Sequence, residues 1–295
     1  MLSAVAILAG GVLFAPLPAQ VFNSVVAIGR TMPDGSRAWI GSGFLYAYLD
    51  HPDLKGESRY RSYIVTNRHV LVSLREILVR FNPGSLSPET RAETMTVRLV
   101  DAEGKQLWMA DETLDVGAIP WAPPRDVVMR LKNLGFIIGE AHIDPTIMAP
   151  GTILSRRLRE SDAAEGDEVF LPGFPIGVMT DQLFGANRNY PVLRRGMIAW
   201  IQPALENLTP DFLVDALIFP GNSGGPVLRQ CAGSAAGEVC LIGMVKSYLP
   251  YSDVASSRQT GRPRVTFEEN SGLAVVIPVD QIDRTIAEHL RGDVH

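Results

Sequence analysis

The stretch that decides the fold is Phe219-Pro220-Gly221-Asn222-Ser223-Gly224-Gly225-Pro226-Val227. Glycines and prolines crowd around Ser223, which predicts a sharp turn, because glycine accepts positive φ angles without steric cost. Consecutive backbone N–H groups in such a turn can point at the oxygen of a substrate carbonyl held against the serine hydroxyl. The turn therefore indicates a nucleophile inside its own oxyanion hole, and a glycine-rich loop with a serine by chance is the alternative.

The composition predicts an ordinary globular, all-β chain. Its 295 residues are 46% hydrophobic, enough for one large domain or two small ones that share a core. The 27 glycines and 21 prolines are scattered between short β-branched runs, a pattern typical of short strands joined by turns. The net charge is −5 without a basic run, so neither nucleic acid nor an anionic membrane is an expected partner.

A serine nucleophile needs a general base, and His69 is the candidate. Of the five histidines, only His69 follows an apolar strand, at 62–65, and begins a short apolar turn. A core histidine satisfied by the backbone is the alternative interpretation.

The base in turn needs a carboxylate, and Asp115 at the head of the segment 116–120 is the candidate. Glycine and alanine in that strand allow close packing beneath a histidine. The competitors are Asp111, in the polar approach to the strand, and Asp126, which precedes another plausible strand at 127–129. Asp115 would accept the imidazole Nδ1–H and stabilise the imidazolium that forms.

These residues resemble those of the trypsin-like serine proteases, the chymotrypsin-fold family that includes the bacterial HtrA-type enzymes. The family has the same chain order of histidine, aspartate and serine. The segments that carry the resemblance are Gly41-Ser42-Gly43-Phe44, Thr66-Asn67-Arg68-His69, Leu114-Asp115-Val116-Gly117-Ala118 and Gly221-Asn222-Ser223-Gly224-Gly225-Pro226. Asn67 and Arg68 depart from the family's T-A-x-H motif.

The resemblance implies two six-stranded antiparallel β-barrels followed by a C-terminal helix, in the HtrA-like form without a PDZ domain. Residues 1–19 are expected to form a signal peptide or apolar N-terminal segment. The expected units then follow in this order: the first barrel with histidine and aspartate at 20–122, a linker or insertion at 123–164, the second barrel with the serine at 165–279, and the helix at 280–292. The helix is also predicted by Ile282, Ile286 and Leu290, which repeat on one face.

The implied activity is that of a serine endopeptidase, with a peptide or protein as its substrate. Ser223 would form an acyl-enzyme, His69 would transfer the proton, and backbone N–H groups at Gly221, Asn222 and Ser223 would hold the oxyanion. Neither a cofactor nor a metal is expected. The residues expected at the substrate pocket are Leu217, Lys246, Ser247 and Tyr248.

Two positions refine this expectation. Leu217 stands where the family's pocket base would carry an acid in an enzyme that selects Arg or Lys, so a small or apolar P1 residue is expected. Asn222 replaces the aspartate that pairs with a newly cut N-terminus in the zymogen-activated trypsins. Since an amide cannot form that ion pair, the site should be ordered by loop contacts or by a partner.

Two other classes of function remain for comparison. A catalytically inactive double barrel could use its groove to bind a peptide or protein, although the intact His69, Asp115 and Ser223 argue against it. An α/β-hydrolase needs a helix after the serine and the order serine, aspartate, histidine. Here Pro226 and a β-branched run follow the serine, so that class is excluded.

Cysteine use and the N-terminus bear on location. Cys231 and Cys240 match no zinc motif and flank a turn-rich segment between two predicted strands, so they could form a disulfide across a hairpin. Two buried thiols are the alternative. Residues 1–19 lack charged side chains and resemble a signal peptide without its basic region, although an uncleaved anchor or an ordered strand remains open. Together these features predict a secreted or periplasmic protein; its oligomeric state does not follow from them.

Overall fold

The computed structural model describes residues 17, 19–49, 60–82, 91–121, 153–154, 158–177, 188–230 and 239–292. Most of the predicted segments 1–19 and 123–164 therefore lie outside the described residues. The bounds of the elements are α1 (Ala19–Ser24), β1 (Val25–Thr31), β2 (Arg37–Leu49), β3 (Tyr60–Asn67), α2 (Arg68–Leu71), β4 (Glu76–Phe81), β5 (Glu93–Arg98), β6 (Met109–Asp111), β7 (Val116–Pro120), β8 (Ile153–Leu154), η2 (Leu158–Ser161), β9 (Glu168–Gly173), η3 (Pro175–Gly177), β10 (Val192–Trp200), α5 (Gln202–Leu205), β11 (Phe212–Asp215), β12 (Pro226–Gln230), β13 (Val239–Ser256), β14 (Pro263–Pro278) and α6 (Val279–Gly292).

The first half of the chain forms an eight-stranded sheet, with the order β5-β4-β1-β2-β3-β7-β6 and β8 paired in parallel with β2. The other pairings are antiparallel. A bridge between Val100 and Gln106 joins the chain that leaves β5 to the chain that enters β6. The first unit is thus a sheet of eight strands and not the predicted six-stranded barrel, because β6 and the short β8 are added.

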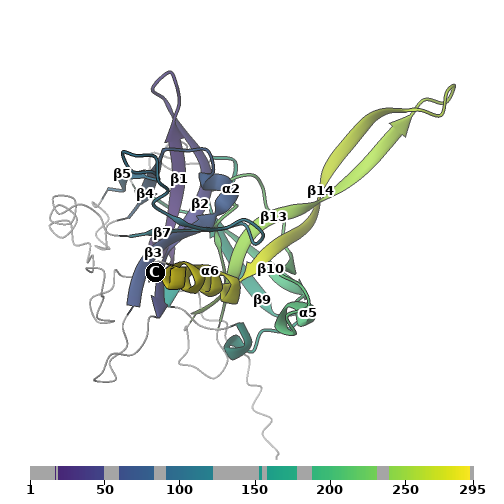
Figure 1. Cartoon of the computed structure of the whole chain (residues 1–295). Helices are drawn as coiled ribbons and strands as arrows, with labels where there is room; N and C mark the ends of the chain where they lie inside the picture. Colours follow the sequence, from purple (N-terminus) through teal and green to yellow (C-terminus); the bar gives the residue numbers. More distant parts are fainter. Residues whose placement is uncertain are drawn as a thin grey trace, which may run out of the picture.

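The second half forms a closed six-stranded antiparallel barrel, β10-β11-β14-β13-β12-β9, and α6 follows it (Figure 1). The predicted all-β class, with two antiparallel β units and a C-terminal helix, is confirmed. Helix α6 contacts β6 and β7 of the first unit and β13 and β14 of the second. It therefore helps to hold the two units together.

Several strands of the first unit are buried on both faces. In β2, Leu45 joins the core inside the first unit, whereas its neighbours Phe44 and Tyr46 join a larger core shared with the second unit. Strand β3 repeats this division, because Ile64 points into the first unit and Val65 into the shared core. Successive side chains of a strand face opposite sides, so each such strand contributes to two cores and its sequence shows no polar alternation.

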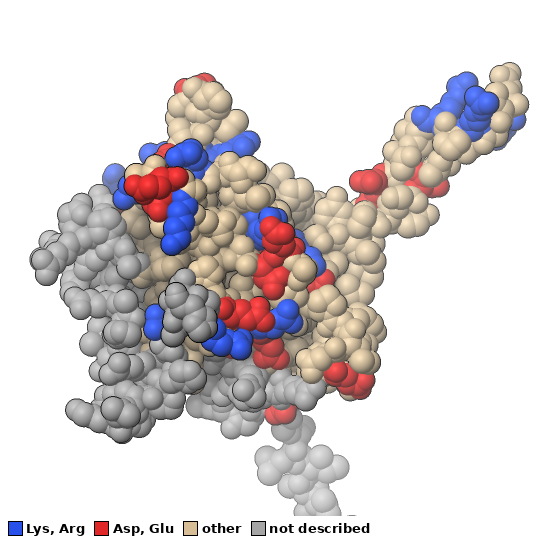
Figure 2. Space-filling model, viewed as in Figure 1, with Lys and Arg blue, Asp and Glu red and all other residues tan. Residues whose placement is uncertain are grey.

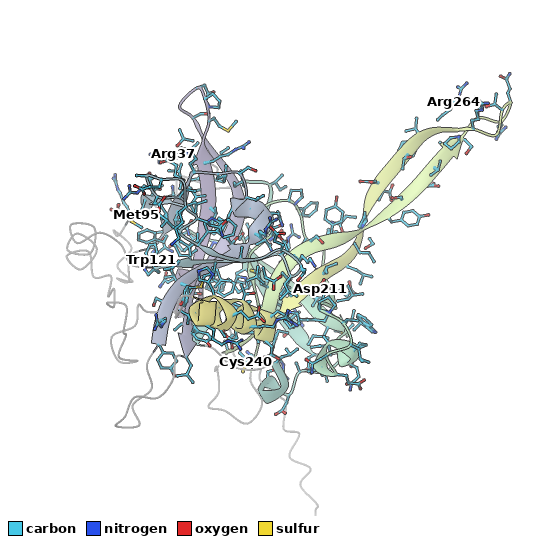
Figure 3. All side chains as sticks on the ribbon, viewed as in Figure 1. Arg37, Met95, Trp121, Asp211, Cys240 and Arg264 are labelled. Carbon is cyan, nitrogen blue, oxygen red and sulfur yellow. The ribbon has the colours of Figure 1, made fainter. Side chains whose placement is uncertain are left out.

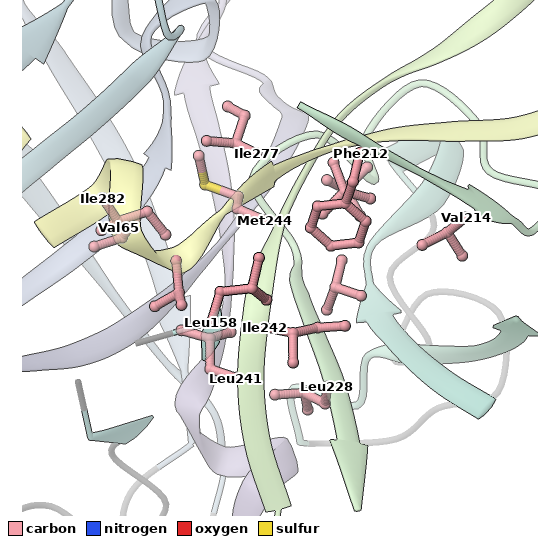
Figure 4. Close-up of a cluster of buried hydrophobic side chains, with 14 of the residues drawn as sticks. Val65, Leu158, Phe212, Val214, Leu228, Leu241, Ile242, Met244, Ile277 and Ile282 are labelled. Carbon is pink, nitrogen blue, oxygen red and sulfur yellow. The ribbon is translucent and has the colours of Figure 1, made fainter. Parts of the chain in front are cut away.

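The shared core continues through the barrel to α6. Figure 4 shows Val65 of the first unit near Ile282 of α6, with Met244, Leu241 and Phe212 of the barrel in the same cluster. Burial of one such aliphatic side chain contributes about 1.5 to 3 kcal/mol. The halves of the chain are thus joined by apolar packing as well as by hydrogen bonds.

Polar contacts fix the position of α6. Tyr46 Oη donates a hydrogen bond of 2.5 Å to Asp283 Oδ1, and the Leu158 N–H donates to Asp280 Oδ1 at 3.0 Å. Both carboxylates lie on the helix and reach segments far away in sequence. The predicted helix therefore has both an apolar and a polar anchor on the rest of the molecule.

The structure differs from simple strand expectations at two places. The β-branched run from Val21 to Ile28 predicts a strand, but residues 21–24 belong to α1, and β1 begins at Val25. The Ser24 hydroxyl donates to the Val21 carbonyl at 2.6 Å, a local bond that competes with strand pairing. The second difference is the length of β13 and β14, which extend far beyond the barrel as a two-stranded ribbon (Figure 1).

Among the described residues, no helix has the length and apolar character needed to cross a membrane. The described ranges also contain no group of three or more His, Cys, Asp or Glu side chains arranged to hold a metal ion.

Candidate active site

His69 and Asp115 are joined by two hydrogen bonds. The backbone N–H of His69 donates to Asp115 Oδ1 at 2.9 Å, and His69 Nδ1 lies 2.7 Å from Asp115 Oδ2. The pairing of β3 with β7 explains this contact. Asn67, at the end of β3, lies opposite Val116, at the start of β7, so the segment that follows β3 and the residue that precedes β7 lie side by side. The His69 side chain is 49% exposed and that of Asp115 19%. One edge of the imidazole is therefore fixed while the ring remains accessible.

Asp115 has a left-handed backbone, with φ of 61°, which aspartate tolerates better than most residues. Its carbonyl accepts hydrogen bonds from the Arg68 N–H at 2.9 Å and from Asn67 Nδ2 at 3.3 Å. The backbone and both carboxylate oxygens of Asp115 are thus tied to residues 67–69. Asn67, which departs from the family motif, takes part in this anchoring.

Asp111, the competing carboxylate, supports the turn that leads to Asp115. Its Oδ1 accepts from the N–H and hydroxyl of Thr113 and from the Leu114 N–H. Burial by itself raises the pKa of Asp111, but these hydrogen bonds and the nearby Arg284 outweigh burial and lower the pKa below its usual range. The other competitor, Asp126, lies outside the described residues.

The turn before Ser223 is of type II. The Asn222 N–H donates to the Phe219 carbonyl at 2.9 Å, Pro220 and Gly221 occupy the central positions, and Gly221 has φ of 95°. The Pro220 carbonyl accepts from the Ile176 N–H at 2.6 Å. Among the described residues, no hydrogen bond uses the N–H of Gly221 or of Ser223. The N–H of Asn222, by contrast, is used within the turn.

Ser42 of β2 connects this turn to the first unit. Its hydroxyl donates to the Gly221 carbonyl at 2.7 Å and accepts from the Phe174 N–H at 2.9 Å, while its N–H donates to the Ser223 carbonyl at 2.9 Å. The carbonyl of Ser42 accepts from Thr66 Oγ1 at 2.7 Å. Ser42 was not among the predicted site residues, although its place between two glycines in the family-like segment 41–44 was a usable signal.

The close approach of the two units requires Gly224. Its φ is 84°, and a Cβ atom there would lie 2.2 Å from both the Ser42 carbonyl oxygen and Thr66 Oγ1. At Gly41, a Cβ atom would lie 2.9 Å from Val70, the neighbour of His69, and 3.5 Å from the Ser223 carbonyl oxygen. Gly41 therefore lies between the segment of the histidine and the segment of the serine.

The Ser223 hydroxyl is directed toward β13. Ser223 Oγ donates to the Lys246 carbonyl at 3.3 Å. In the described part of the chain, no hydrogen bond joins Ser223 Oγ to the His69 ring. The structure therefore brings His69 and Asp115 into direct contact and places Ser223 in the adjoining loop.

Asn222 is a buried part of the turn, with 1% exposure. Its Oδ1 accepts from the Phe219 N–H at 3.0 Å. The side chain thus bonds to its own loop, which supports the expectation that loop contacts order the site.

The residues expected at the substrate pocket come from two segments. Leu217, after β11, is 47% exposed. Lys246, Ser247 and Tyr248 follow one another in β13. The Lys246 ammonium lies 2.7 Å from Asp211 Oδ2, and both side chains are partly buried. The charge of Lys246 is therefore already compensated within the protein.

The expected disulfide stays a prediction. Cys240 lies in β13 and is 3% exposed, but Cys231 lies outside the described residues.

Two antiparallel β units, a helix packed against both and a Gly-Asn-Ser-Gly-Gly turn at their junction define the class of chymotrypsin-like double-β folds. The chain belongs to the trypsin-like peptidase family, since the model of the trypsin-like peptidase domain matches residues 41–237, about two thirds of the chain. Among solved structures, the crystal structure of the Rv3671c protease in its inactive form is similar, with 15% identity, a TM-score of 0.44, and 92% of this chain and 90% of that chain covered. A comparison with curated proteins finds no match.

Proposed function

We propose that the protein is a serine endopeptidase that cleaves peptide bonds through an acyl-enzyme at Ser223. The observation that carries the proposal is the double hydrogen bond between His69 and Asp115, beside a glycine-rich serine turn. The family match supports a peptide or protein as the substrate.

In this mechanism the proton moves from Ser223 to His69 and then to the leaving amine. Ser223 Oγ must first turn from the Lys246 carbonyl toward Nε2 of His69, and such contacts often tighten only when substrate binds. The oxygen then attacks the peptide carbonyl while Nε2 takes its proton. Asp115 holds Nδ1–H and stabilises the imidazolium. Water later releases the acyl group by the reverse proton transfers.

The oxyanion would be held by the N–H groups of Gly221 and Ser223. Both N–H groups are without a hydrogen-bond partner among the residues described. The Pro220 carbonyl is itself hydrogen-bonded to the Ile176 N–H. Each such donor contributes about 3 kcal/mol to stabilisation of the transition state. The Asn222 N–H would instead maintain the turn, because the Phe219 carbonyl already accepts it.

A small or apolar P1 residue fits the proposed pocket better than a charged one. Leu217 supplies no carboxylate for a basic side chain, and Asp211 compensates the Lys246 ammonium that could otherwise attract an acidic one. Ser247 and Tyr248 of β13 would flank the substrate backbone, which can bind there as an added strand.

A fluorophosphonate probe tests this assignment. We expect the wild type to be labelled and Ser223→Ala to be unlabelled. His69→Ala and Asp115→Asn should react about 10³ to 10⁴-fold more slowly. His289→Ala, on the exposed side of α6, is the matched control and should react like the wild type.

Hydrolysis of an unfolded protein such as casein completes the test. An unlabelled, inactive and correctly folded wild type would refute the peptidase and favour the inactive double barrel that binds peptides. That alternative predicts peptide binding that Ser223→Ala leaves unchanged.

We also propose that the protein acts outside the reducing cytosol, on the basis of its two cysteines and apolar N-terminal segment. Alkylation of the unfolded, unreduced protein followed by mass spectrometry tests whether the two cysteines form a disulfide. Modification of both Cys231 and Cys240 would contradict the proposed disulfide.

A further inference from the structure

The longest projection formed by the described residues is a β ribbon of residues 249–271, which we call the arm (Figure 1). Its strands pair from Pro250 opposite Asn270 to Ser256 opposite Pro263. The turn at its tip is closed by the Ser257 N–H, which donates to the Arg262 carbonyl at 2.9 Å. Isolated two-stranded ribbons are marginally stable in water. The arm is therefore a candidate for stabilisation by a binding partner.

One face of the arm carries three of its large apolar side chains together with Asp253 and Glu269, whereas Val254 lies on the opposite face. Tyr251 lies opposite Glu269, Phe267 opposite Asp253, and Val265 opposite Ala255. Directly opposed residues of an antiparallel pair share a face, and so do residues two positions apart. We call Tyr251, Ala255, Val265 and Phe267 the apolar face. Tyr251, Val265 and Phe267 are 58%, 50% and 53% exposed, an unusual cluster of large apolar groups in water.

The charges of the arm are separated along its length. Figure 2 shows basic side chains near its tip and acidic ones closer to the barrel, and Figure 3 places Arg264 near the tip. The basic residues are Arg258, Arg262 and Arg264, and the acidic residues are Asp253, Glu268 and Glu269. None of the ion pairs found among the described residues involves any of these six.

This pattern is self-complementary under a two-fold axis. On β13, the midpoint between Arg258 and Asp253 falls between Ala255 and Ser256. On β14, the midpoint between Arg262 and Glu269 falls between Val265 and Thr266, whose partners are Ala255 and Val254. The two centres therefore differ by about one residue along the ribbon, and both lie within the apolar face.

We propose that the arm binds the arm of a second copy of this chain, antiparallel and with two-fold symmetry. The apolar face packs against its counterpart, and each basic tip meets the acidic segment of the other arm. A two-fold axis repeats every contact, so one complementary pair counts twice.

A polyanion fits the arm less well than a second copy does. It would be attracted by the arginines at the tip but repelled by Asp253, Glu268 and Glu269, and it would leave the apolar face uncovered. A second copy satisfies all three features. The proposed dimer does not depend on the peptidase activity, because none of the arm residues belongs to the proposed catalytic group.

Sedimentation velocity of the full chain over a range of concentrations tests the proposal. The wild type should form dimers, and the double variant Tyr251→Ser, Phe267→Ser should be monomeric at the same concentrations. Thermal unfolding should confirm that the variant barrels remain folded. A wild type that stays monomeric up to about 100 µM, well above a micromolar dissociation constant, would overturn the proposal.

Charge reversal identifies which residues meet. Arg262→Glu and Glu269→Arg should each weaken the dimer about tenfold, because each places like charges together twice. An equal mixture of the two variants should form heterodimers at wild-type strength, since every contact is then attractive. Arg98→Glu is the control, because Arg98 is exposed on β5 and lies outside the arm. It should leave the dimer unchanged. A dimer insensitive to both reversals, or a mixture without recovery, would overturn the proposed arrangement.

Discussion

Ser42 Oγ donates a hydrogen bond of 2.7 Å to the carbonyl of Gly221, a residue 179 positions later in the chain. The same hydroxyl accepts from the Phe174 N–H, so its donor direction is fixed. The neighbouring peptide is held by the Ile176 N–H, which donates to the Pro220 carbonyl. These contacts orient the turn that presents Ser223, and they come from both β units. The geometry of the serine turn is thus a property of the assembled fold.

Ser42→Ala should slow labelling of Ser223 by about tenfold or more. The substitution leaves the Phe174 N–H and the Gly221 carbonyl buried without their partner, a cost of about 1 to 3 kcal/mol. The rate of fluorophosphonate labelling and the unfolding temperature measure the effect. Ser36→Ala, in an exposed turn, is the control and should change neither. Unchanged labelling in Ser42→Ala would show that the turn keeps its shape without this hydroxyl.

Gly224→Ala should be far more damaging than Gly35→Ala. Both glycines have similar positive φ angles, 84° and 82°, so alanine suffers the same backbone strain of about 1 to 2 kcal/mol at each site. At Gly224 the new Cβ also meets two oxygens at 2.2 Å, whereas nothing lies within 4 Å at Gly35. Denaturant unfolding of the two variants isolates the steric contribution. Equal losses of stability would mean that the units separate easily at this contact.

Asn222→Asp should destabilise the folded protein by about 2 kcal/mol at neutral pH. The side chain is buried, and no hydrogen bond joins it to a Lys or Arg in the described part of the chain. Burial without a cation raises the pKa of the new carboxyl above its unfolded value of about 3.9. The folded state then binds more protons, so the variant loses stability as pH rises above that value. Urea unfolding from pH 3.5 to 7 tests this slope, and a variant that is as stable as the wild type at pH 7 would refute it.

Asp111→Asn should reduce stability at neutral pH but not in acid. The hydrogen bonds to Thr113 and Leu114 outweigh burial and lower the pKa of Asp111 in the folded state. Its stabilising contribution is therefore fully present above the unfolded pKa of about 3.9 and is lost as pH falls through the folded value. The loss should be about 1 kcal/mol at pH 7, with slower labelling because Asp115 follows the same turn.

Asp34→Asn provides a matched control for this turn. Asp34 accepts from the N–H and hydroxyl of Ser36 in the same manner, but at an exposed site away from Ser223. It should leave labelling unchanged. The role of the ionised carboxylate would be contradicted if the free energies of unfolding of the wild type and Asp111→Asn differed by the same amount at pH 3 and pH 7.

Local sequence was sufficient to predict the fold class and the partnership of His69 with Asp115. Each residue lies at the end or head of a strand, and β3 and β7 pair so that the two residues meet. The C-terminal helix was also predictable, because its apolar spacing repeats on one face. At Val21 the prediction was wrong: the local bond from Ser24 to Val21 and the packing of Val21 on the shared core accompany a helical turn instead of a strand.

The arm shows a different limit of sequence interpretation. Residues 249–271 mix prolines, serines and charged groups, so no strong alternation marks them as strands. Their strand structure depends on cross-strand pairing with residues that lie beyond a turn. Pairing between distant residues is decided by the fold and not by the composition of either strand.

The sequence by itself was sufficient to predict the candidate site: a serine in a glycine-rich turn, a histidine and an aspartate in the family's order, and an asparagine in place of the aspartate that would form an N-terminal ion pair. Such features are local, because φ preferences and functional groups belong to single residues. Only the tertiary structure decided that Asn222 bonds to its own loop, that Asp111 holds the turn before Asp115, and that Ser42 fixes Gly221. These contacts join groups whose positions depend on strand register and on packing between the two units, and neither can be read from neighbouring residues alone.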